Sequence, residues 1–153
     1  MIKIIVSEQL LIHHRASGEQ VSYPISTAAL GVGNALGSYQ TPLGKHRLFA
    51  CIGGGYPKGT IFVGREPVGL FEPSLVDEDK DWILTRILWL EGLEEGYNKG
   101  GDVDTKARYI YIHGTNEEGK IGTPASHGCI RMRNDDVLDL FEHVAEGEVV
   151  DIT

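Results

Sequence analysis

Apolar and polar residues alternate along several short segments of this chain, which is the pattern of strands with one buried face. Turn-forming glycine, serine and proline residues separate these segments, and residues 31–44 form a glycine-rich loop. The pattern predicts a mainly β domain, with strands over residues 2–6, 9–12, 21–26, 46–52, 60–64, 108–113 and 149–152.

Two further segments have helical spacing. Residues 82–90 follow the acidic run 77–81 and place apolar residues on one side of a helix, although residues 85–91 fit a buried strand equally well. Residues 136 to about 145 predict a second helix, capped by Asn134 and the two aspartates after it. We therefore expect a mainly β fold with one or two helices.

Length and charge narrow the class of protein. A chain of 153 residues fits one domain over residues 1–153, and its net charge of −8 argues against nucleic acid as a partner. No segment approaches the roughly 20 apolar residues that cross a bilayer, and residues 1–11 do not form a signal peptide. We expect no membrane anchor and a cytoplasmic protein, or a periplasmic or wall-associated one if the sequence is trimmed.

Candidate chemistry concentrates in Ser126-His127-Gly128-Cys129, with His113 upstream. Three interpretations compete: core packing, a zinc site and nucleophilic catalysis. Packing would explain each residue alone but not the cluster with its glycines. For zinc, His-x-Cys is a poor chelate spacing and a fourth ligand is not obvious. We therefore expect neither metal nor cofactor, and we expect Cys51 and Cys129 to be free thiols.

Nucleophilic catalysis uses the whole cluster. Cys129 would attack a carbonyl as a thiolate while a histidine moves the proton, and backbone N–H groups around Gly128 and Cys129 would hold the oxyanion. Arg131 offers a planar fork for a substrate carboxylate, whereas Arg133 fits a surface salt bridge. His113 precedes the cysteine in the chain, which disfavours a papain-type layout.

Ile112-His113-Gly114, a short loop and then Ser126-His127-Gly128-Cys129-Ile130-Arg131 resemble the signature of the L,D-transpeptidase (YkuD-type) family. The resemblance extends over nearly the whole chain and includes Thr41-Pro42-Leu43-Gly44. Arg131 stands where the short consensus has Asn. The resemblance implies a β-sandwich-like catalytic domain that acts on peptidoglycan stem peptides.

By this resemblance, Cys129 attacks the carbonyl of the third stem residue, releases the terminal D-alanine and forms a thioester. His113 would be the base and acid, oriented by a backbone carbonyl such as that of Gly114. His127 would support the thiolate, and Ser126 would position the loop. The family also implies acylation of Cys129 by carbapenems.

The acceptor stays open at this point. An amine from a second stem peptide would give a 3→3 cross-link, as in cell wall biogenesis. Water would make the enzyme an L,D-carboxypeptidase that trims soluble tetrapeptides to tripeptides, as in murein recycling. The rival from another class is a non-catalytic wall-peptide binding module.

Outside the motif, residues 73–104 are long enough to form a lid or wall over the site. Trp82, Trp89 and Tyr97 are its candidate contacts, although core packing explains them as well. The acidic run 77–79 fits a solvated face. The remaining histidines and Cys51 are expected to be structural or solvated, namely His13, His14, His46 and His143.

Overall fold

The computed structural model describes residues 1–74 and 80–153. It confirms a mainly β domain, in which one α-helix and three short 3-10 helices accompany ten strands among the described residues. In chain order the elements are β1 (Ile2–Ile5), η1 (Val6–Glu8), β2 (Leu10–His14), β3 (Gln20–Ser26), β4 (Gly44–Ile52), β5 (Thr60–Val63), β6 (Glu66–Leu70), β7 (Ile83–Gly92), η2 (Gly101–Val103), β8 (Tyr111–Gly114), η3 (Glu118–Lys120), β9 (Ile130–Met132), α1 (Asn134–Phe141) and β10 (Val149–Ile152).

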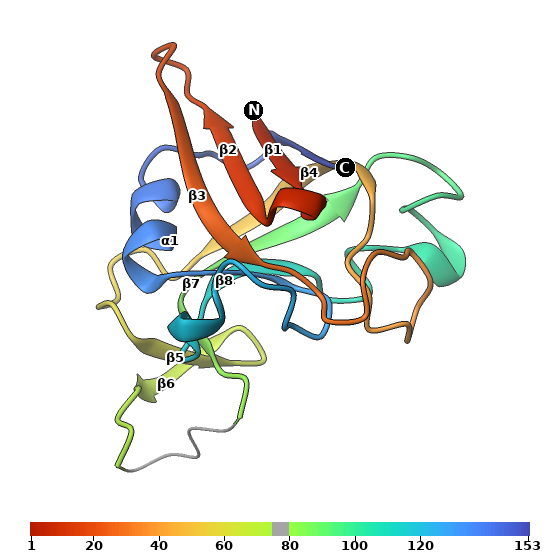
Figure 1. Ribbon diagram of the computed structural model, residues 1–153. Coiled ribbons are helices and arrows are strands. Elements are labelled where there is room, and N and C mark those ends of the chain that lie inside the picture. Colours follow the sequence, from red (N-terminus) through yellow and green to blue (C-terminus); the bar gives the residue numbers. More distant parts are fainter. Residues whose placement is uncertain (75–79) are drawn as a thin grey trace.

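The strands form one continuous sheet in the order β4-β10-β1-β2-β3-β9-β8-β7-β5-β6, and a further pairing of β4 with β7 closes it into a barrel. The β5–β6 hairpin extends from β7 beyond the closed part (Figure 1). Two pairs, β1–β10 and β8–β9, are parallel, and the others are antiparallel. Closure removes most sheet edges, which would otherwise recruit other chains.

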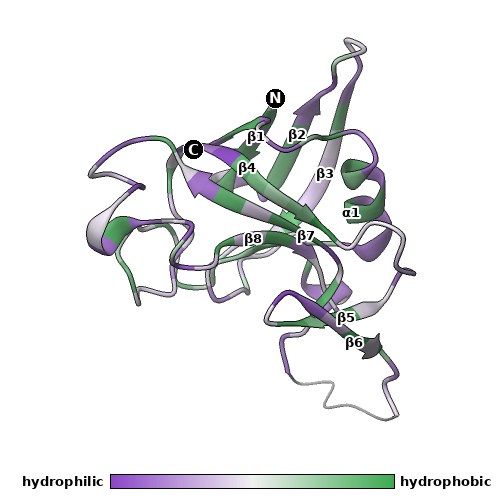
Figure 2. Cartoon of the chain, turned by 180° about the vertical axis from the view of Figure 1, so that it is seen from behind, coloured by the Kyte–Doolittle hydropathy of each residue, from purple (hydrophilic) through white to green (hydrophobic). Residues whose placement is uncertain are grey.

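Strand alternation sorts side chains between the barrel interior and its outer face, and Figure 2 shows hydrophobic and hydrophilic residues interleaved along the strands. On β8, Ile112 belongs to the main core, whereas Tyr111 points to the other face with Ile87 and Phe62. Val137 and Leu140 of α1 join the main core, and the helix packs against β7 and β8. The outer face of β7, β8 and β9 is the one that carries the candidate site.

Residues 83–92 form strand β7, so helical spacing is the wrong choice of the two patterns there. The reason is that both faces of β7 are buried, since Leu88 packs in the main core and Ile87 packs on the other face, which removes the strict alternation of a half-buried strand. A bulge after Leu84 adds to this effect, because Thr85 has a φ of 76° there. Residues 75–79, including the predicted acidic face, lie outside the described residues.

The C-terminal helix is shorter than predicted, ending at Phe141 instead of about residue 145, and its N-cap is Arg133. The predicted capping by Asn134 is wrong, because its amide instead donates to the Thr115 carbonyl at 2.8 Å. The Asn134 N–H donates to a Glu118 carboxylate oxygen at 2.8 Å, so another element caps the helix. The strand expected over residues 108–113 begins only at Tyr111, because Tyr109 has a φ of 56°.

Cys51 and Cys129 are free thiols, and Cys51 is half-buried against the main core. Among the described residues, no helix is long and apolar enough to cross a membrane.

His46 gives the first testable prediction. It is buried on β4, where Nδ1 lies 2.9 Å from the Gly44 carbonyl and Nε2 lies 2.9 Å from the Thr105 hydroxyl. Burial lowers the pKa of His46 to about 4, from an ordinary value of 6.5. Between these values the unfolded chain binds the proton more tightly, so stability falls as the pH drops through this window.

We expect His46→Gln to destabilise the protein more at about pH 7.5 than at about pH 4.5, with the difference amounting to about 2–3 kcal/mol. Urea unfolding followed by tryptophan fluorescence measures this free energy. His14→Gln, at an exposed position, is the control and should show no such pH dependence. An equal cost of His46→Gln at both pH values would contradict a neutral buried imidazole.

Candidate active site

The nucleophile candidate, Cys129, ends the loop that leads into β9. Its Sγ atom accepts the Tyr111 N–H at 3.3 Å and lies 3.5 Å from the Tyr109 carbonyl oxygen, to which the thiol donates. The side chain is partly exposed. Both backbone contacts come from β8 and the residues just before it, so the sulfur position is set by the neighbouring parallel strand.

The pKa of Cys129 is raised to about 11, mainly by burial and to a smaller extent by the Asp81 carboxylate. The Tyr111 N–H, Arg108 and Arg131 act in the opposite direction, but more weakly. The resting nucleophile is therefore a thiol, which needs a base at the moment of attack.

The candidate for that base is His113, which is buried on the same face of β8 as Tyr111. In the parallel pairing of β8 and β9, His113 lies opposite Arg131, and Cys129 lies two residues before Arg131 on the same face. Nδ1 of His113 is 2.6 Å from the Gly114 carbonyl oxygen. A carbonyl only accepts, so Nδ1 carries the proton and Nε2 of the neutral ring is the basic nitrogen.

Burial lowers the pKa of His113, although its contact with the Gly114 carbonyl and the charge of Asp81 act against this. The ring is thus neutral near pH 7. Gly114 itself fits a tight space, because a Cβ there would press against the Asn134 side chain and lie 2.8 Å from the Leu84 carbonyl oxygen. The tight packing explains why glycine supplies this carbonyl.

Ser126 and Gly128 shape the loop that presents the thiol. The Ser126 hydroxyl donates to the Cys129 carbonyl at 2.6 Å and accepts the Gly128 N–H at 3.2 Å. Gly128 has a φ of 131°, and its carbonyl accepts the Thr41 hydroxyl at 2.9 Å. Ser126 thus joins both ends of the loop, and its predicted positioning role in catalysis stays a prediction. Thr41, from the Thr-Pro turn, is a loop contact that sequence reasoning missed.

His127 lies differently from His113. Its side chain is 74% exposed, with Nδ1 3.6 Å from an Asp81 carboxylate oxygen and its ring edge-on to Tyr39. A hollow of about 180 Å³ opens beside it, lined also by Arg108 and Ile110. Exposure separates the two histidines, and only His113 has the buried, oriented ring that a general base needs.

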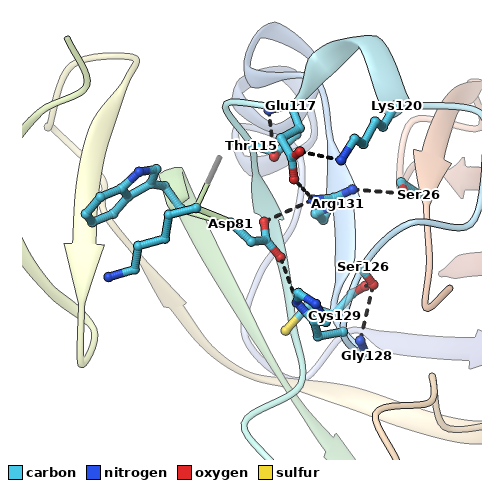
Figure 3. A network of polar contacts seen from close by, with 12 residues as sticks. Ser26, Asp81, Thr115, Glu117, Lys120, Ser126, Gly128, Cys129 and Arg131 are labelled. Carbon is cyan, nitrogen blue, oxygen red and sulfur yellow. Dashed lines mark hydrogen bonds and ion pairs between the residues drawn. The ribbon is translucent and has the colours of Figure 1, made fainter. Parts of the chain in front are cut away.

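Arg131 is fully buried and its guanidinium is already paired. Nη1 lies 3.0 Å from an Asp81 carboxylate oxygen and 2.9 Å from one of Glu117, and Nη2 lies 3.5 Å from the Ser26 hydroxyl (Figure 3). Lys120 and then Arg131 hold the pKa of Glu117 below its ordinary value. In this arrangement Arg131 ties β9 to the segment at Asp81, and its predicted contact with substrate stays a prediction.

The three aromatic residues that the sequence suggested as lid contacts lie in different parts of the fold. Trp89 lies on the outer face of β7 near the thiol, 5.9 Å from the ring centres of Tyr109 and Tyr111. Trp82 packs under Lys80 just after the undescribed residues, and Tyr97 is exposed. Asp81, Arg108 and Tyr111 were missed, because they meet the thiol only through folding. Across the described residues, no group of three or more His, Cys, Asp or Glu side chains could hold a metal ion.

The fold and the site define a class of protein, a closed β-barrel domain with a histidine on one strand and a cysteine directly before the parallel neighbouring strand. The chain belongs to the YkuD family of L,D-transpeptidase catalytic domains, whose family model matches residues 1–152.

One curated relative, "Probable L,D-transpeptidase ErfK/SrfK" of Salmonella typhimurium, is 53% identical over 121 residues, covering 63% of this chain and 39% of the relative. L,D-transpeptidase 3 from Mycobacterium tuberculosis, solved with a faropenem-derived adduct, has a TM-score of 0.58 at 17% identity, covering 99% of this chain and 59% of that one. LdtMt1 in complex with imipenem has a TM-score of 0.56 at 15% identity, with 99% and 57% covered. The chain thus spans less than two thirds of each of these three proteins.

Arg131 gives the prediction of this site. Arg131→Met would leave the Asp81 and Glu117 carboxylates without their buried partner, so we expect a loss of about 3–5 kcal/mol in the free energy of unfolding. The exposed Arg133→Met should change it by less than about 0.5 kcal/mol. Urea unfolding compares the two. A stable Arg131→Met protein with a raised KM would instead support a substrate contact.

Proposed function

We propose that this domain is a cysteine-dependent L,D-transpeptidase that acts on the tetrapeptide stems of peptidoglycan through a thioester. The observation that supports it best is the His113 ring, buried and neutral, with its Nδ1 proton held by Gly114 on the face that carries Cys129. A binding module has no use for such an oriented base beside a thiol. The rest of the proposal assigns one role to each group in this arrangement.

In the acylation step, Nε2 of His113 takes the Cys129 proton as Sγ attacks the carbonyl of the third stem residue. The tetrahedral intermediate then collapses, the bond to D-alanine nitrogen breaks, and His113 returns the proton to that nitrogen. A thioester and free D-alanine result. Because the thiol and imidazole start neutral, the proton moves only when the carbonyl is in place.

The negative oxygen of the intermediate needs a hydrogen-bond donor in the same loop. The Gly128 N–H is already directed at the Ser126 hydroxyl, so we assign this role to the Cys129 N–H. Ser126 and Thr41 keep the loop in the required shape through the Cys129 and Gly128 carbonyls.

In the second step, an amine of another stem peptide attacks the thioester and forms a 3→3 cross-link. Water is the alternative acceptor, which would make the domain an L,D-carboxypeptidase. The exposure of His127 and the partial exposure of Cys129 favour keeping this alternative, because solvent can approach from that side. A wall polymer outside the cytoplasm would supply the amine, and soluble muropeptides in the cytoplasm would leave more to water.

Cys129→Ala tests the mechanism. It should lower D-alanine release from a disaccharide tetrapeptide by at least about 1,000-fold, because no other group can form the thioester. Cys51→Ala, the matched control, should stay within about twofold of the original rate. Substantial release by the Cys129→Ala protein would contradict the mechanism. Mass spectrometry of the products separates the acceptors, since tripeptide monomers mean hydrolysis and dimers mean transfer.

Carbapenem acylation tests the pairing of thiol and base. Burial raises the pKa of both Cys51 and Cys129 to about 11, so thiol acidity alone does not separate them. In the proposed mechanism Cys129 has His113 as its base, on the face of β8 and β9 that carries both residues. Intact-mass spectrometry with imipenem should show one added drug mass, located at Cys129 and lost in His113→Gln. Labelling of Cys51, or an unmodified protein, would contradict this pairing.

A further inference from the structure

Arg65 stands at the tip of the β5–β6 hairpin and rests on aromatic residues next to the thiol. Its guanidinium carbon is 4.7 Å from the ring centre of Trp89 and 5.2 Å from that of Tyr109. Nη1 donates to the Tyr111 hydroxyl at 3.0 Å. The same Tyr111 offers its N–H to Sγ of Cys129. One tyrosine residue therefore links the cation to the nucleophile.

The hairpin tip is built in an uncommon way. Val63 pairs with Glu66, and both residues of the turn between them have positive φ, 55° at Gly64 and 67° at Arg65. Such turns favour glycine or asparagine at these places, so an arginine there is costly. Backbone strain of this kind is concentrated at functional sites, where it places a side chain in a required position. Here the backbone directs the guanidinium onto the platform formed by Trp89, Tyr109 and Tyr111.

Most donors of this guanidinium are unused. Arg15, Arg47 and Arg131 are each paired with carboxylates. Among the residues that the structure describes, Arg65 has no carboxylate within ion-pair distance, and its one hydrogen bond goes to Tyr111. Stacking holds the planar fork in place before any ligand arrives, which lowers the entropy lost on binding.

The hollow beside this platform has about 440 Å³ and is lined by Trp89, Tyr109 and Lys106, among others. Lys106 adds a second cation, with its Nζ 3.7 Å from the Phe49 ring centre. The one acid in the lining, Asp104, accepts the Gly100 and Ala107 N–H groups at 2.8 and 2.9 Å. Although the chain has a net charge of −8, Arg65, which stacks on Trp89 and Tyr109, and Lys106, which lines the hollow with them, bring two cations to this region.

We infer that Arg65 is a specificity-determining residue, which binds the carboxylate at the far end of the diamino acid side chain in the stem peptide. The inference rests on the proposed function, in which the carbonyl of that diamino acid meets Cys129. Diaminopimelate carries this carboxylate and lysine lacks it. The side chain of diaminopimelate lies between the carbonyl that Cys129 attacks and the far carboxylate. In the same way, Tyr111 lies between the Cys129 thiol, at its N–H, and the Arg65 guanidinium, at its hydroxyl. A bidentate pair with Arg65 therefore selects diaminopimelate stems.

The test compares three tetrapeptides that differ only at the third residue: diaminopimelate, its side-chain amide and lysine. We expect D-alanine release to favour free diaminopimelate over its amide at least about tenfold in kcat/KM, mainly through KM, because the pair is made before the chemical step. Arg65→Gln should remove this preference and leave the amide and lysine substrates nearly unchanged. Arg65→Lys should keep part of it, and the exposed Arg133→Gln should keep it all.

Two further measurements separate binding from turnover and the donor stem from the acceptor stem. Calorimetry with the Cys129→Ala protein measures binding of the same peptides without turnover, and Arg65→Gln in that background should weaken only the free diaminopimelate peptide. A preference seen in dimer formation but not in D-alanine release would assign the carboxylate to the acceptor stem.

Equal rates for all three peptides would overturn the inference and leave the proposed function standing. An Arg65→Gln loss that is equal for all three would also overturn it, because it would show a purely structural hairpin contact. If no peptide is bound or cleaved by the original protein, the proposed function fails first, and the inference fails with it.

Discussion

The parallel pairing of β8 with β9 is the constraint on which the site depends. Parallel neighbours need a long connection, and residues 115–129 supply it with the 3-10 turn η3 and the loop that ends at Cys129. Since the register is fixed, His113 falls opposite Arg131 and the Tyr111 N–H reaches Sγ. Shifting the register by one residue would turn both Tyr111 and His113 into the core. The connection between β8 and β9 therefore positions Cys129, the candidate nucleophile, and strand β8 positions His113, the candidate base.

Burial then gives the two reacting groups their resting state. It raises the pKa of the Cys129 thiol and lowers that of the His113 imidazole, so both are neutral. The nearby charges do little to favour a thiolate, because Arg131 and Lys120 are already paired with the Asp81 and Glu117 carboxylates. The site consequently holds its proton until a carbonyl is bound. This resting state is compatible with the proposed mechanism, in which His113 takes the Cys129 proton as the thiol attacks.

The sequence was informative where chemistry is local. Ser126 to Cys129 form one loop whose internal hydrogen bonds lie within four residues, and the Gly114 carbonyl is adjacent to His113, so a motif contains both. It was uninformative where contacts join distant segments. Asp81 reads as part of a helix start, and the sequence pattern does not single out Arg65, until β5 and β7 bring them to the β8–β9 face. The strand β7 was ambiguous for the same reason, because its neighbours bury it on both faces.

The two histidines show how burial, rather than nearness in sequence, divides the roles. His127 is two residues from Cys129, but its ring points to solvent and meets Asp81 and Tyr39. His113 is distant in the chain, yet its ring is enclosed and its tautomer is fixed by a carbonyl that has no freedom to move, since Gly114 is wedged between Leu84 and Asn134. A base must hold its lone pair in one direction through the reaction. An exposed ring such as that of His127 would lose conformational entropy each time it is oriented for the reaction, whereas folding has already oriented the buried ring of His113.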